Sequence, residues 1–121
     1  MDIKTLESEI LQIEEILYVL DGDMERLQID MIYTENLHKA LLENVVVLKT
    51  IGIAVALDAY KKTKNDIKNM EARVKHNRTL GFEIEKKIAS LEKTLLYKEN
   101  LKNELLTQLS SDKVLIFKRN L

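Results

Sequence analysis

The chain has 121 residues, of which 45% are hydrophobic and 32% charged, and its formal net charge is −1. It contains no Cys, Pro or Trp and only three Gly, which excludes disulfides and thiolate metal sites and leaves few residues that end helices. The abundance of Leu, Ile, Lys and Glu is typical of long or coiled helices. The opening MDIKTLESEIL lacks the basic and then apolar layout of a signal peptide, so we expect a cytoplasmic protein, or a virion component if phage-encoded.

The first twenty residues predict an amphipathic helix over 2–20. Apolar residues recur there at alternating intervals of three and four, which is the a and d spacing of a coiled coil. They are Ile3, Leu6, Ile10, Ile13, Leu17 and Leu20. The DGD sequence at 21–23 favours a turn between helices, because glycine suits a helix C-terminus and aspartate can cap the next helix. One unbroken helix is the alternative, since Met24 and Leu27 keep the same heptad phase.

Two further helices are predicted, over 23–76 and 80–109. In the longer one, apolar residues follow helical spacing as far as Ala59 and resume at Ile67 after a polar interval. The boundary falls at 77–79, where Asn and Thr side chains can cap a new helix start.

A short apolar tail follows the polar SSDK sequence. Its residues suit a β-strand or an extended docking tail. They are Val114, Leu115, Ile116 and Phe117. We therefore expect one helical coiled-coil domain at 1–111 and a C-terminal docking tail at 112–121.

These elements predict an all-α protein, an elongated antiparallel hairpin or coiled-coil bundle of three helices. Short turns favour antiparallel neighbours, and a turn at 77–79 would place residues 45–60 beside 95–110. Both segments are apolar on more than one face, so a single hairpin would leave a large apolar patch exposed. We therefore expect a homo-oligomer. The predicted interface consists of Val45, Leu48, Ile51, Gly52, Val55, Leu95, Leu101 and Leu105.

The most apolar stretch is VVVLKTIGIAVAL at 45–57, which we interpret as the middle of the long helix. Its β-branched residues leave a pair of strands, bent at 50–52, as an alternative. Glu43, Lys49 and Asp58 confine the apolar run to well under the ~20 residues that a membrane span needs. We therefore expect no membrane partner.

Charge is distributed unevenly along the chain. Residues 1–44 hold eleven acidic and three basic residues, whereas 61–78 hold seven basic and two acidic ones. The basic segment is a candidate contact for a polyanion such as nucleic acid, a solvated helix face, or a contact for the acidic end of another subunit. Its basic residues are Lys61, Lys62, Lys64, Lys68, Arg73, Lys75 and Arg78.

No motif in the sequence indicates catalysis, a cofactor or a metal. His38 and His76 are far apart and lack partners at ligand spacing, and the DGDME sequence lacks the alternating oxygen ligands of a calcium loop. We therefore expect a non-enzymatic assembly or structural subunit that self-associates and binds a further protein, in a phage virion or another large complex. Two alternatives remain. One is a phage or bacterial inhibitor of a host protein, its acidic N-terminal half mimicking nucleic acid; the other is a nucleic-acid-associated protein using 61–78.

Overall fold

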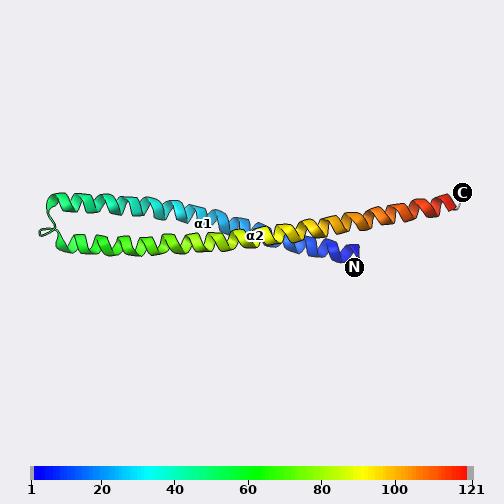
Figure 1. Ribbon diagram of the computed structural model, residues 1–121, viewed down its shortest axis with the longest axis horizontal. Coiled ribbons are helices and arrows are strands. Elements are labelled where there is room, and N and C mark those ends of the chain that lie inside the picture. Colours follow the sequence, from blue (N-terminus) through cyan, green and yellow to red (C-terminus); the bar gives the residue numbers. More distant parts are fainter. Residues whose placement is uncertain (1, 120–121) are drawn as a thin grey trace. The chain divides into compact units, whose positions relative to one another are not determined.

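The chain folds into two helices in the computed structural model, which describes residues 2–119 and the side chains of 2–111. Helix α1 spans Ile3–Ile51 and helix α2 spans Leu57–Arg119 (Figure 1). No strand occurs within 2–119, which confirms the all-α class. The three-helix arrangement is wrong, because the turns predicted at 21–23 and 77–79 both lie inside continuous helices.

Heptad phase explains why neither predicted turn forms. On α1 the apolar spacing runs from Leu20 through Met24 to Leu27 without a shift. On α2 the same heptad phase continues from Val74 through Asn77 and Gly81 to Ile84. A helix interior glycine costs only about 1 kcal/mol, and ending the helix would misalign the apolar row of a and d positions, here called the seam.

The chain reverses direction at residues 52–56, inside the stretch that we interpreted as mid-helix. Gly52 has φ 113°, a conformation that L side chains rarely adopt, and its amide donates to the Leu48 carbonyl at 3.0 Å. Its own carbonyl accepts hydrogen bonds from the amides of Val55 and Ala56, both at 3.1 Å. Gly52 therefore ends α1 and closes the turn, as glycine commonly does after a helix. The long helix over 23–76 and the strand alternative are both wrong here.

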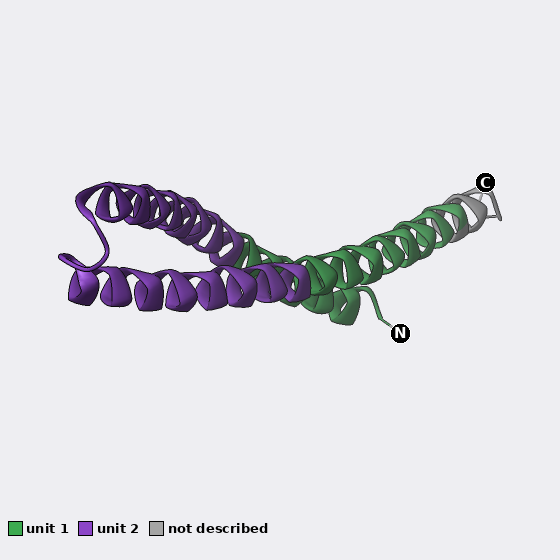
Figure 2. Ribbon diagram, turned by 60° about the vertical axis from the view of Figure 1, so that its left-hand side comes forward, with its two compact units in different colours: residues 1–21, 85–121 green, residues 22–84 purple. Residues whose placement is uncertain are grey.

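The chain divides into two compact units, shown in different colours in Figure 2. Unit 1 comprises 1–21 with 85–121, and unit 2 comprises 22–84. Each unit therefore takes one piece of α1 and one piece of α2.

In unit 2 the two helices pack antiparallel on either side of the turn. The Asn44 amide donates to the Thr63 hydroxyl at 3.2 Å near the turn, and the Asn77 amide reaches Asp30 farther from it. The antiparallel packing of these two helix segments replaces the pairing that we expected between residues 45–60 and 95–110. The buried apolar core of the unit consists of Leu27, Val45, Leu48, Ile67 and Ile84. At Gly81 an added Cβ would lie 3.3 Å from Leu27 Cδ2, so glycine permits the close approach of the helices there.

In unit 1 the helices are also antiparallel. Asp2 caps α1 by accepting a hydrogen bond from the Lys4 amide at 2.6 Å. The buried core consists of Leu6, Ile10 and Ile13. Lys98 Nζ lies 2.5 Å from Glu9 Oε2, and Lys102 Nζ lies 3.4 Å from Glu7 Oε1.

Helix α2 runs beyond the start of α1 in unit 1 (Figure 2). Leu106 and Leu109 are exposed in this part. The helix includes the predicted docking tail as far as Arg119, so a strand or extended tail is wrong. The side chains of Val114, Leu115, Ile116 and Phe117 lie outside the described ones.

Candidate interaction surfaces

A polar cluster lies in the seam of unit 2, where Asp30 on α1 faces Arg73 and Asn77 on α2. Asn77 is 5% exposed, and its Nδ2 donates to Asp30 Oδ2 at 2.7 Å. Arg73 forms an ion pair with the other carboxylate oxygen. The Asn77 hydrogen bond and the Arg73 guanidinium together hold the pKa of Asp30 below its ordinary value of 3.8, although partial desolvation opposes them. The cluster joins the two helices by polar contacts at this point, and buried polar residues of this kind specify register in coiled coils.

A mixed-charge groove lies beside this cluster. Its lining residues are Glu35, His38, Glu71, Val74, Lys75 and Arg78. His38 is partly buried at a seam position, and its Nε2 lies 3.4 Å from Glu71 Oε1. The groove is lined by two acidic and two basic side chains besides His38, so it presents no single-sign site for a charged ligand.

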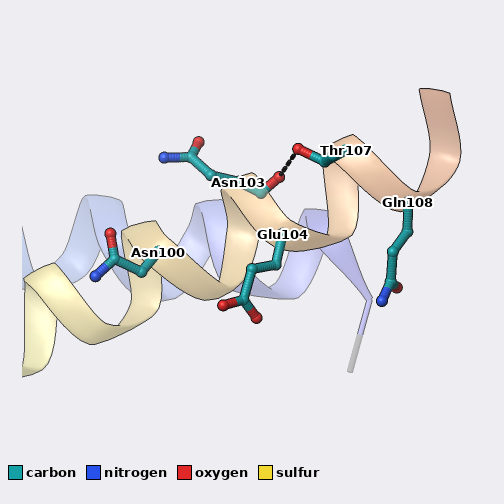
Figure 3. A pocket seen from close by; sticks show the side chains of 5 residues that line it. All are labelled: Asn100, Asn103, Glu104, Thr107 and Gln108. Carbon is teal, nitrogen blue, oxygen red and sulfur yellow. Dashed lines mark hydrogen bonds between the residues drawn. The ribbon is translucent and has the colours of Figure 1, made fainter. Parts of the chain in front are cut away.

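A second hollow, shown in Figure 3, lies on α2 in unit 1. All five lining residues come from this one helix: Asn100, Asn103, Glu104, Thr107 and Gln108. Asn103 and Thr107 project from one side of the helix, and Glu104 and Gln108 from another, so these side chains do not converge on one point (Figure 3). The Thr107 hydroxyl donates to the Asn103 carbonyl at 2.9 Å, within the helix itself. This hollow is a polar helix surface and offers no enclosed binding site.

The outer face of α1 in unit 2 is unexpectedly apolar. Five side chains at heptad positions b, c and f, which point away from the partner helix, are each more than half exposed. They are Ile29, Ile32, Tyr33, Val46 and Val47, here called the outer stripe. In unit 1, Leu11, Tyr18 and Val19 occupy the same kind of position and are exposed as well.

The turn between the helices forms a second exposed apolar surface. The hairpin tip, defined as residues 51–57, contains no charged residue. Four of its large apolar side chains are exposed, and Val55 is the most exposed at 83%. They are Ile51, Ile53, Val55 and Leu57.

The basic segment 61–78 occupies α2 in unit 2, and its members have different environments. Arg73 pairs with Asp30, and Lys64 Nζ lies 5.8 Å from the centroid of the Tyr60 ring. Four others are exposed and form no ion pair within the part of the chain that the structure describes. They are Lys61, Lys62, Lys68 and Lys75.

The residues predicted as an oligomer interface do not share one surface. Val45 and Leu48 are buried in the seam of unit 2, whereas Ile51, Gly52 and Val55 belong to the hairpin tip. The other three lie on α2 in unit 1 and are partly buried: Leu95, Leu101 and Leu105. Seam residues are already covered within the chain, so they are not free to contact a second copy.

The sequence prediction assigns all apolar residues of 23–59 to one row, so it separates neither the outer stripe nor the turn from the seam. The seam of α1 ends at Val45 and Leu48, and the seam of α2 starts again at Thr63 and Ile67 with the heptad shifted by one residue. That shift across Gly52 is the signal in the sequence that marks the reversal.

Metal-ligating side chains do not cluster in the described part of the chain. No group of three or more His, Cys, Asp or Glu residues is placed to hold an ion there. Within residues 2–119, neither helix carries an apolar segment long enough to cross a bilayer.

Comparison with known proteins gives no relative. No family model, no curated protein and no solved structure matches this chain. The candidate functional features of the molecule are the outer stripe, the hairpin tip and the exposed lysines of 61–78.

Proposed function

We propose that the protein is a non-enzymatic assembly subunit that self-associates through the outer stripe of α1. The observation that supports this most strongly is the exposure of Ile29, Ile32, Tyr33, Val46 and Val47 on the face opposite the seam. Scattered exposed apolar residues are normal, but several on one helix face indicate a binding surface. Here they form two groups, Ile29 with Ile32 and Tyr33, and Val46 with Val47, separated on the same face by polar residues such as Lys39 and Glu43.

The heptad positions of the outer stripe suit packing against another helix. Each large apolar side chain that leaves water contributes about 1.5–3 kcal/mol. Since a second copy presents the same stripe, two copies can cover each other symmetrically. The outer face of α2 in unit 2 carries Lys61, Lys68 and Lys75 instead. Pairing through α1 would therefore give a bundle with an apolar interior and a charged exterior.

The test is the substitution Ile32→Glu, measured by sedimentation velocity. A carboxylate in the centre of the stripe is costly to bury, so we expect the oligomer to become monomeric while helix content by circular dichroism stays unchanged. The matched control is Ala72→Glu, an exposed substitution on the outer face of α2, which should leave the oligomer intact. A wild-type protein that stays monomeric at high concentration would refute the proposal.

A second candidate function is binding of nucleic acid by the basic segment. Lys61, Lys68 and Lys75 recur every seven residues, so they line one face of α2, and none is paired within the described residues. Such a row can follow a phosphate backbone. The double substitution Lys68→Glu with Lys75→Glu should then abolish salt-dependent binding to duplex DNA in a gel-shift titration. Binding that is absent in the wild type, or unchanged in this variant, counts against this function.

The inhibitor alternative draws less support from the structure. Several acidic side chains of the N-terminal half already contact basic groups of the same chain: Glu7, Glu9, Asp23 and Asp30. A nucleic acid mimic needs its carboxylates free for a partner's basic groove.

A further inference from the structure

We infer that the hairpin tip inserts into the surface of a membrane that contains anionic lipids. The tip is the end of unit 2 where α1 passes into α2, drawn in purple in Figure 2. Its sequence, IGIAVAL, has no charge, and its four large apolar side chains are all exposed. The chain itself leaves these side chains uncovered, because both helices run away from the turn.

Lysines flank the tip on both helices. Lys49 lies in the last turn of α1, and Lys61, Lys62 and Lys64 follow the start of α2. Lys49, Lys61 and Lys62 form no ion pair within the described residues. Asp58 is the sole acidic residue between 46 and 65. The end of the hairpin thus combines an apolar point with unpaired positive charge, which complements lipid phosphates and carboxylates.

The spacing between the apolar tip and the lysines fits the bilayer interface. At ~1.5 Å per residue along a helix, Lys61 lies ~6 Å and Lys64 ~10 Å behind Leu57. Interfacial segments insert their apolar side to about 5–10 Å below the headgroups. With the tip at that depth, the lysine side chains reach the anionic headgroup layer.

The expectation of no membrane partner follows from the apolar run, which is too short to span a bilayer. Peripheral insertion of a turn does not require a span. A bilayer suits the tip because it offers an apolar layer directly beneath a charged one, which matches an exposed apolar turn followed by lysines. The lysines further select an anionic surface.

The experiment measures partitioning of the full chain onto vesicles by co-sedimentation. The vesicles contain phosphatidylserine and phosphatidylcholine in equal amounts, and vesicles of phosphatidylcholine alone serve as the comparison. We expect the wild type to bind the anionic vesicles at least tenfold better. Val55→Glu should reduce this binding at least tenfold, and so should the joint change of Lys61, Lys62 and Lys64 to Glu. The control Leu96→Glu, an exposed apolar site in unit 1, should bind as the wild type does.

Tryptophan fluorescence separates insertion from adsorption by charge alone, because the chain has no native Trp. In Val55→Trp, anionic vesicles should shift the emission to the blue, whereas Leu96→Trp should show no shift. An unshifted Val55→Trp, full binding by Val55→Glu, or equal affinity for neutral vesicles would each overturn the proposal. Loss of self-association in Val55→Glu without any vesicle binding by the wild type would assign the tip to a second copy.

The membrane proposal and the assembly proposal can fail separately. Ile32→Glu lies on the outer stripe and outside the tip, so it should dissociate the oligomer and leave the Val55→Trp emission shift in place. Vesicle binding by a monomeric protein would support membrane insertion of the tip and count against self-association.

Discussion

Gly52 is the single residue on which the reversal of the chain depends. Its φ of 113° is strained for any L side chain, and an added Cβ would meet nothing within 4 Å, so the cost of a substitution is conformational and not steric. We expect Gly52→Ala to lower the free energy of unfolding by about 1–3 kcal/mol, seen as a lower Tm in thermal melts.

The control for this prediction is Gly22→Ala. Gly22 lies inside α1, where an added Cβ makes an ordinary contact 3.7 Å from Arg26 Nη1. Alanine there should raise stability by about 0.5–1 kcal/mol. Equal Tm values for Gly52→Ala and Gly22→Ala would contradict the positive φ of Gly52.

We expect the stability of unit 2 to depend on the ionisation of Asp30. Its pKa is lower in the folded chain than its ordinary 3.8 because of the Asn77 hydrogen bond and Arg73. The ionised carboxylate therefore stabilises the fold above about pH 4, and this contribution is lost as the pH falls through the lowered folded value. We expect Asp30→Asn to lower Tm at neutral pH, and the gap from the wild type to narrow in melts below about pH 4. A gap that stays constant with pH would contradict the role of this carboxylate.

At the scale of elements, each unit fixes the alignment of its helices with polar contacts beside an apolar seam. In unit 1, Lys98 occupies a seam position and its ammonium reaches Glu9 across the helix pair. Such charge pairs at the edge of a seam select orientation and register in coiled coils.

A charge exchange tests this contact. Glu9→Lys and Lys98→Glu should each lower Tm, because each places like charges side by side. The double variant should recover much of the loss, since it restores an opposite pair. Additive losses in the double variant would show that the pair contributes nothing to the register. The control is Glu14→Lys, which should change Tm little. Glu14 is exposed and forms no ion pair in the described structure.

At the scale of the whole molecule, the decisive question is whether one reversal or two organise the chain. A single turn at 52–56 brings Asn44 beside Thr63, whose side chains lie 3.2 Å apart. The native chain has no Cys, so Asn44→Cys with Thr63→Cys should form an intramolecular disulfide on oxidation. Closing a loop of this size should raise stability by about 3 kcal/mol, measured as a higher Tm before reduction.

The negative control pairs Asn44→Cys with Ala72→Cys, which lies farther along α2 on its outer face. This pair should give no intramolecular disulfide. A monomer in which the first pair also stayed reduced would contradict the single hairpin.

Much of the fold was predictable because helix formation depends on residue type and on spacing along the chain. The lack of proline, the few glycines and the three-and-four spacing of Leu and Ile predict long helices without any tertiary information. The position of the reversal was not predicted, since DGD at 21–23 has stronger turn chemistry than the IGI sequence around Gly52. Propensity favoured the wrong site, and the uninterrupted seam through Gly22 outweighed it.

The candidate surfaces were less predictable than the fold. The sequence by itself determined the all-helical class, the heptad rows and the uneven charge, because each depends on residue type and spacing along one chain. Only the tertiary structure decided that Val45 and Leu48 are buried while Val46, Val47 and Val55 are exposed. The physical reason is that burial depends on which face meets the partner helix, and the place where the chain turns back sets that partner.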